Sequence, residues 1–175
     1  REERSKTAQG YVAAPSGANY NAMTGMTRQG KIIMFYSPKG GTGCTTLAVN
    51  VAVALCNEET RVIIVDANLQ FGDVALFLNE QGKNTIIDLA PRADELDPGI
   101  VEEVVIKHAV TGLHILASPS RPEHGEKVSP DQFSQLLRYL RQLYPYVVVD
   151  TSTYVNDVTL SVLDVADAVV LVTVQ

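Results

Sequence analysis

The sequence predicts an α/β fold in which a doubly wound, mostly parallel sheet lies between two layers of helices. Three observations predict this fold: short runs of apolar residues, helical patterns between those runs, and an apolar fraction of 46% in a chain of 175 residues. A chain of this length and composition can bury the core of one globular domain, with some sequence to spare.

The predicted strands are almost unbroken in Val, Ile and Leu, without regular alternation with polar residues. Such runs are typical of central strands in a parallel sheet, because helices cover both faces of that sheet. The five runs span residues 31–36, 61–67, 112–118, 146–151 and 168–174.

The stretches between the strands carry helical patterns. Ser129 and Gln132 have the spacing of a capping box, and Pro130 stands at the first helical position. Strands and helices that alternate along a chain imply right-handed crossovers and therefore a doubly wound layer. The predicted helices span residues 45–57, 98–108, 129–144 and 157–166.

Residues 1–30 differ in composition from the rest of the chain. From residue 5 onward this segment mixes Gly, Ala, Ser, Asn and Thr without an apolar period. Such a segment buries too little surface to offset the entropy of ordering it. We therefore expect a flexible linker at residues 1–30 that follows another domain, and a single folded domain at residues 31–175.

Charge, cysteine and histidine usage exclude several classes of protein. The formal net charge of −6 gives this segment no overall attraction to nucleic acid or anionic lipid, so we predict no direct DNA or membrane contact for it. Cys44 and Cys56 cannot form a disulfide framework and lack CxxC spacing, which favours a reducing cytosol. No apolar run approaches the roughly 18 residues of a membrane span. The three histidines show no metal-ligand spacing.

A glycine-rich stretch, KGGTGCTT, lies between the first predicted strand and the first predicted helix. Glycine tolerates positive φ and lets a backbone wrap around an anion, so that successive N–H groups point into the concavity. In this context the stretch predicts a phosphate-binding loop, and the hydroxyl of Thr45 can reach a magnesium ion. The candidate binding residues are Lys39, Gly40, Gly41, Thr42, Gly43, Cys44, Thr45 and Thr46.

Cys44 admits two interpretations. A thiol near a helix N-terminus can have a lowered pKa and act as a redox sensor. Alternatively, Cys44 is a small side chain that fills a space. The second interpretation is favoured because no resolving cysteine or neighbouring cation is evident in the sequence.

Two aspartates follow buried strand patterns. Asp150 ends YVVVD, and Asp66 ends RVIIVD. The carboxyl ends of parallel strands meet at one edge of a sheet, so both side chains are expected beside the glycine loop. Carboxylate and hydroxyl oxygens suit Mg²⁺, so Thr45, Asp66 and Asp150 are the candidate metal residues.

The loop resembles the deviant Walker A motif of the ParA and MinD superfamily, usually KGGxGKTT, and Lys39 matches its early signature lysine. The resemblance implies a P-loop NTPase-like fold with ATP and Mg²⁺ as cofactors. It also implies a homodimer that forms on ATP binding, in which Lys39 contacts phosphates bound by the partner subunit. The YVVVD segment matches the Walker B strand of that superfamily.

Other segments are similar to the TadZ and CpaE branch, whose members are ATPase-like proteins of tight-adherence (Flp) pilus assembly. Members of this branch commonly carry a receiver-like domain before the ATPase-like domain. Their ATPase-like domains also continue further, so residues 31–175 would be the N-terminal part of one, with adenine contacts encoded after Gln175. The similar segments are residues 65–79, 85–105, 113–133 and 146–150.

Two positions depart from the superfamily pattern and bear on hydrolysis. Cys44 replaces the second lysine of the loop, which removes a charged hydrogen bond of about 1.5–3 kcal/mol while the backbone cradle remains. Asn68 replaces the second acid of the usual VDxD, and an amide can orient a water molecule but cannot accept its proton. We therefore expect ATP binding that is weakened but retained, with weak or absent hydrolysis.

Three functions remain open from the sequence. The first is a nucleotide-dependent dimerisation switch that localises pilus machinery, for which the bound state itself carries the signal. The second is a partitioning ATPase that acts on DNA, and the third is a degenerate scaffold that binds no nucleotide. The first implies pilus-assembly or polar localisation proteins as partners and a cytoplasmic protein, with recruitment to a cell pole or the inner membrane surface left open.

Overall fold

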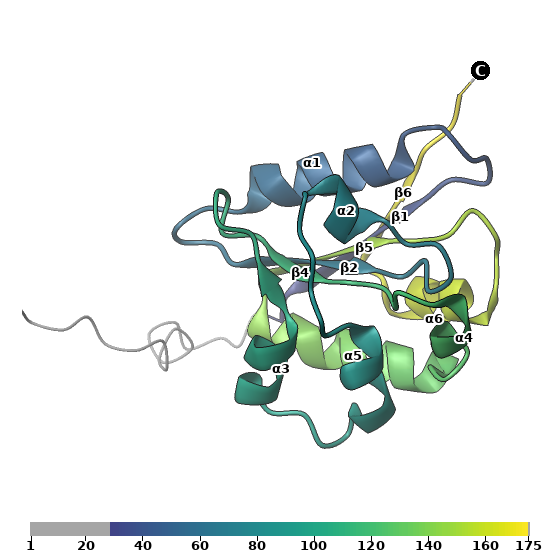
Figure 1. The fold of residues 1–175 in the computed structure, drawn as a ribbon. Helices are drawn as coiled ribbons and strands as arrows, with labels where there is room; N and C mark the ends of the chain where they lie inside the picture. The colour runs from purple at the N-terminus through teal and green to yellow at the C-terminus, as the bar shows by residue number, and fades with distance from the viewer. Residues whose placement is uncertain (1–28, 175) are drawn as a thin grey trace, which may run out of the picture.

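The computed structural model describes residues 29–174, which form a six-stranded sheet between two helical layers (Figure 1). The strands are β1 (Lys31–Tyr36), β2 (Val62–Asp66), β3 (Ile106–Lys107), β4 (His114–Leu116), β5 (Tyr146–Asp150) and β6 (Ala168–Leu171). They lie in the order β3-β4-β2-β5-β1-β6, and all neighbours are parallel except β3 and β4. The predicted doubly wound, mostly parallel α/β fold is thereby confirmed.

The helices cover both faces of this sheet. They are α1 (Cys44–Leu55), α2 (Val74–Phe77), α3 (Pro98–Val104), α4 (Pro122–Gly125), α5 (Pro130–Leu143) and α6 (Asp157–Val165), with 3₁₀ turns η1 (Ile86–Asp88) and η2 (Ala90–Arg92). Figure 1 shows α1 and α2 on one face of the sheet, and α3, α5 and α6 on the other. No helix among residues 29–174 has the length and apolar character needed to cross a bilayer.

Two apolar cores lie on opposite faces of the sheet because successive strand residues point to opposite sides. On β2, Ile64 packs in the core that includes Ala48 and Val49 of α1. Its neighbour Ile63 packs in the other core, which includes Leu136 and Leu140 of α5. Burial on both faces explains why the sequences of the central strands β2 and β5 are apolar throughout.

The helix predicted for residues 98–108 is shorter than expected. It ends at Val104, and residues 106–107 form β3, which pairs antiparallel with β4. Val104 packs in the core that contains α5, whereas Ile106 packs against the α1 core on the other face. A continuing helix could not deliver both side chains to opposite faces, and β-branched residues favour the extended alternative.

The other predicted elements are confirmed with small shifts at their ends. The predicted capping box at Ser129 and Gln132 is present, with the Ser129 hydroxyl accepting from the Gln132 amide at 3.2 Å. The strand predicted for residues 112–118 is limited to His114–Leu116. The short elements α2, α4, η1 and η2 lie in segments for which no regular element was predicted.

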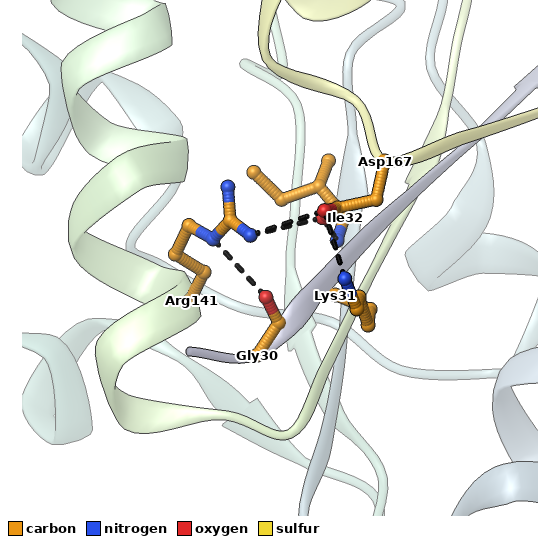
Figure 2. A network of polar contacts seen from close by, with 5 residues as sticks. All are labelled: Gly30, Lys31, Ile32, Arg141 and Asp167. Atoms are coloured by element: carbon orange, nitrogen blue, oxygen red, sulfur yellow. Dashed lines mark hydrogen bonds and ion pairs between the residues drawn. The ribbon is translucent and has the colours of Figure 1, made fainter. Parts of the chain in front are cut away.

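The start of β1 is joined to the C-terminal part of α5 and to the residue just before β6 (Figure 2). Asp167, which precedes β6, accepts hydrogen bonds from the Ile32 amide, from Lys31 and from Arg141 of α5. Arg141 also donates to the Gly30 carbonyl at 3.1 Å. Gly30 is therefore already part of the domain, while residues 1–28 of the predicted linker lie outside the described residues.

Candidate nucleotide-binding site

The glycine-rich loop forms an open concavity between the end of β1 and the start of α1. Gly41 and Gly43 have φ of 75° and 83°, which lie in the left-handed region that favours glycine. A Cβ added at Gly40, Gly41 or Gly43 would meet no atom within 4 Å, so the space in front of the loop is free. Gly43 is the N-cap of α1 and provides no side-chain cap, so the free amides at this end of the helix can bind an anion.

Ser37, the residue after β1, holds the loop in place through hydrogen bonds. Its side chain is buried, and its hydroxyl oxygen accepts from the Thr42 hydroxyl at 2.9 Å and from the Lys39 amide at 3.3 Å. The same hydroxyl donates to the Lys39 carbonyl at 3.0 Å. One buried side chain thus links Lys39 and Thr42, the two residues that flank Gly40 and Gly41.

A cavity of about 840 Å³ opens over the loop, and it is large enough for a nucleotide. Residues from three further segments complete its wall: 68–73 after β2, 125–130 from the end of α4 to the start of α5, and 151–158 from the end of β5 into α6. All eight candidate loop residues line it, and so do Asn68, Asp73, Thr151 and Tyr154. The carboxyl ends of β1, β2 and β5 thus open towards one cavity, as expected for an open α/β sheet.

The two candidate metal carboxylates lie behind this wall. Asp66 and Asp150 are partners in the register of β2 and β5, which confirms that they are neighbours at one sheet edge. Both are almost fully buried. Thr45, which lines the cavity, donates a hydrogen bond of 2.7 Å to Oδ2 of Asp150. The structure thus brings the three candidate metal residues together beside the loop.

Asp150 carries an incompletely satisfied carboxylate. Its pKa is raised to about 6, mainly by burial; the hydrogen bond from Thr45 lowers the pKa, and the charge of Asp73 raises it. Oδ1 of Asp150 is buried without a hydrogen-bond partner among the described residues. A buried, unpartnered oxygen is costly unless a ligand satisfies it, so the residues present fit a magnesium ion at this point.

Asp66 is held in place by hydrogen bonds from the segment that follows it, residues 68–74. The amides of Asn68 and Val74 donate to its two carboxylate oxygens at 3.1 and 3.2 Å. Burial raises the pKa of Asp66 to about 7; those two amides lower it, and the charge of Asp150 raises it. Any Cβ at Gly72 would collide with the Asp66 carboxylate and the Ser118 hydroxyl, so residues 68–73 can fold over Asp66 only with glycine there.

The thiol of Cys44 does not have the properties of a redox sensor. It is half-buried at the first position of α1. Burial raises its pKa to about 11, and the charge of Asp150 raises it further. The neutral thiol is therefore the dominant form, which agrees with the space-filling interpretation.

The two residues proposed to act on phosphate differ in how freely they can move. Lys39 is exposed at the rim of the cavity. The side chain of Asn68 closes its own turn, donating to the Phe71 carbonyl at 3.0 Å and accepting from the Phe71 amide at 3.4 Å. Asn68 therefore lines the cavity, but its side-chain amide is already hydrogen-bonded to Phe71 within residues 68–71.

Sequence reasoning missed Ser37, Gly72 and Asp73. Ser37 and Gly72 act through contacts with residues that the motif already contains, and a motif pattern does not reveal such support. The Gly-Asp pair at residues 72–73, shortly after a strand that ends in an acid, was a usable signal for a close approach followed by a helix start.

Fold and site together define a P-loop nucleotide-binding domain of the three-layer α/β/α type. A family model described as "AAA domain" (AAA_31) matches residues 30–175, so the chain belongs to this family. Solved relatives place it among the ATPase-type domains of the ParA and MinD superfamily. A ParA family ATPase from Chlorobium tepidum TLS is 28% identical with a TM-score of 0.75, over 81% of this chain and 59% of that one.

Two further matches agree. The septum site-determining protein MinD of Pyrococcus horikoshii, solved as a complex with Mg-ADP, is 26% identical with a TM-score of 0.69, over 82% of this chain and 57% of that one. An uncharacterised ATP-binding protein of Methanocaldococcus jannaschii is 26% identical over 142 residues, which are 80% of this chain and 51% of the relative. The chain thus spans about half the length of the curated relatives it matches.

Proposed function

We propose that this domain binds ATP with magnesium and serves as a nucleotide-dependent dimerisation switch in pilus assembly and localisation, with weak or absent hydrolysis. The observation that carries this proposal is the open loop at residues 39–46, with Asp150 and its unpartnered Oδ1 directly behind Thr45. The loop supplies amides for phosphate, and the carboxylate supplies a place for the metal.

ATP and magnesium are further supported by the relatives, among which one is described as ATP-binding and another was solved with Mg-ADP. In the proposed complex, Thr45 and Asp150 hold the metal, and Asp66 supports it from the neighbouring strand. Bound magnesium would neutralise phosphate charge. The N–H groups of residues 41–46 would orient the phosphates, and this contact does not need a lysine at residue 44.

Dimerisation over the nucleotide is supported by what surrounds the cavity. Phe71 and Tyr154 line it from two sides, with exposed fractions of 74% and 79%. Large apolar side chains that rim a polar cavity are typical of a surface that a partner covers. Lys39 lies on the same rim, where it could contact phosphates held by a second subunit.

The expectation of weak hydrolysis is supported by the chemistry of Cys44 and Asn68, which would lie beside the bound phosphates. Cys44 provides no positive charge to stabilise the charge that develops during phosphoryl transfer. Asn68 cannot accept a proton, and its amide is bonded to Phe71. Such a site favours a signal carried by the bound state over one that depends on turnover.

The role in pilus assembly rests on the similarity of residues 65–79, 85–105 and 113–133 to the TadZ and CpaE branch. Residues from two of these segments, 65–79 and 113–133, line the cavity, so the similarity includes part of the surface that a partner would contact. A cytoplasmic protein that recruits pilus-assembly or polar localisation proteins fits this surface.

The first test measures binding and association together. We expect ATP with Mg²⁺ to produce heat in calorimetry and a dimer in light scattering. Lys39→Ala should retain binding and weaken the dimer, because the trans contact is lost. If the parent gives neither heat nor a thermal shift with ATP, the scaffold alternative holds. Unchanged dimerisation of the Lys39 variant would remove the trans contact.

The second test restores the residues that the superfamily pattern has at positions 44 and 68. The double variant Cys44→Lys, Asn68→Asp should hydrolyse ATP faster than the parent, and each single variant should show a smaller gain. A parent that already hydrolyses as fast as the double variant would refute the assigned roles of Cys44 and Asn68. Robust hydrolysis that DNA stimulates would instead favour the partitioning function.

A further inference from the structure

Asp73 lines the cavity, and its carboxylate forms no hydrogen bond or ion pair within residues 29–174. It stands directly before α2, at the N-cap position, yet its side chain makes no capping hydrogen bond. None of the hydrogen bonds among residues 29–174 involves this carboxylate, and the residue is exposed where it lines the cavity. An N-cap aspartate normally stabilises its helix through such a bond, so its structural role here is small.

The position of Asp73 also places it near the buried acids. The amide of Val74, the next residue, donates to Oδ2 of Asp66 at 3.2 Å, and Asp66 and Asp150 are register partners on β2 and β5. The ion pairs found between residues 29 and 174 are Lys31–Asp167, Arg61–Glu102 and Arg141–Asp167, and none involves Asp66, Asp73 or Asp150. Among residues 29–174, two buried acids and the exposed Asp73 thus lie on neighbouring segments, and none of them forms an ion pair.

An independent observation points to a ligand at the same place. Oδ1 of Asp150 is buried and unpartnered, while Oδ2 is bonded to Thr45. A divalent cation would satisfy that oxygen and would also relieve the repulsion between the carboxylates. Mg²⁺ keeps several water molecules when it binds, and nearby carboxylates orient such waters by hydrogen bonding.

We propose that Asp73 is an additional positioning residue for the magnesium-bound nucleotide, and that its carboxylate would accept hydrogen bonds from water molecules bound to the metal. This inference rests on the proposed binding of ATP with Mg²⁺. Asp73 acts through the metal's water molecules and does not touch the reacting phosphate.

Other acids that line the cavity do not fit this role. Glu126 and Asp157 line the same cavity, but, unlike Asp73, neither adjoins a residue that is hydrogen-bonded to Asp66 or Asp150. Asp157 lies in the first turn of α6, where its charge interacts favourably with that helix. Of the exposed acids in the wall, Asp73 therefore has the best position relative to Asp150.

The test compares ATP binding with and without Mg²⁺ by calorimetry, using EDTA for the metal-free arm. In the parent, Mg²⁺ should tighten ATP binding. In Asp73→Asn, metal-free ATP should bind as well as before or better, because a negative charge is lost. ATP with Mg²⁺ should bind about tenfold more weakly, equivalent to about 1.4 kcal/mol. Asp73→Glu should recover most of the Mg²⁺ effect.

The control is Asp94→Asn, which removes the same charge from an exposed residue between η2 and α3 that does not line the cavity. It should bind as the parent does in both arms. Melting without nucleotide verifies the fold of each variant, and Asp73→Ser provides a second neutral variant if the asparagine fails to fold.

Three outcomes would count against the proposal in different ways. If the parent does not bind ATP in either arm, the proposed function fails and this inference fails with it. If the parent binds and the neutral Asp73 variants keep the full Mg²⁺ effect, only the inference fails. An equal loss of affinity in both arms would show a general structural effect and would also overturn it.

Discussion

At the scale of single residues, Ser37 determines whether the loop is formed before a ligand arrives. We expect Ser37→Ala to lower stability by about 1 kcal/mol, because the Thr42 hydroxyl and the Lys39 amide lose a partner in a partly exposed setting. Affinity for ATP should fall further than stability, since the loop would have to be ordered on binding. Calorimetry and thermal melting measure the two effects.

The matched control for this substitution is Ser134→Ala in α5, whose hydroxyl donates to the Asp131 carbonyl in the first turn of the helix. This variant also loses one serine hydroxyl, far from the glycine loop in sequence. ATP affinity should remain at the level of the parent. An equal loss of affinity in both serine variants would refute a bracing role for Ser37.

Asp150 should make the nucleotide-free domain less stable as the pH rises. Its folded pKa of about 6 lies above the ordinary value of 3.8, mainly because of burial, so the folded state holds a proton that the unfolded state has released. The stabilisation is complete below about pH 4 and is lost as the pH rises through 6. Between pH 5 and pH 8 the loss should be on the order of 1–2 kcal/mol.

The measurement is the difference in melting temperature between Asp150→Asn and the parent, in EDTA, at pH 5 and at pH 8. This difference should favour the variant more strongly at pH 8. Comparing the two proteins removes the contribution of His114, whose pKa burial lowers to about 4 and which therefore acts with the opposite sign. A difference that does not change with pH would show that Asp150 is ionised in the folded domain throughout.

At the scale of elements, Arg141 joins the end of α5 to the first residue of the domain and to the start of β6 (Figure 2). Its side chain has an exposed fraction of 16%, so the ion pair with Asp167 is shielded from solvent more than most surface pairs. We expect Arg141→Gln to destabilise the domain by about 1–2 kcal/mol. Denaturant unfolding gives the value.

Arg138→Gln is the control because Arg138 lies one turn earlier on the same helix, is exposed, and forms no ion pair among residues 29–174. Its unfolding free energy should stay within about 0.5 kcal/mol of the parent. Equal destabilisation by the two substitutions would mean that α5 helicity, and not the junction with Gly30 and Asp167, sets the effect.

Elements were predictable from sequence where a single local pattern decides them. The strands Val62–Asp66 and Tyr146–Asp150 are apolar because both faces are buried, and the start of α5 is marked by its capping box. The end of α3 was not predictable in this way, because Ile106 leaves the helix to reach a core that is formed by distant residues. In the site, the glycine loop was recognisable as a motif, whereas the roles of Ser37 and Gly72 depend on three-dimensional contacts.

At the scale of the whole described domain, residues 29–174, β6 has both an exposed apolar surface and a free sheet edge. Within residues 29–174, β6 pairs with β1 on one side and with no strand on the other. Val169 and Leu171 have exposed fractions of 46% and 59%. An exposed, apolar edge strand is a template for pairing with another chain, so the isolated domain should associate through this edge as concentration rises.

We expect Leu171→Lys to reduce that association, because a charged side chain on the edge strand opposes pairing between chains. The control is Leu163→Lys on α6, which removes a leucine of similar exposure, 49%, from a helix that has no free strand edge. Light scattering over a concentration series without nucleotide distinguishes the two. Equal reduction by both substitutions would assign the association to apolar exposure in general, and not to the edge of the sheet.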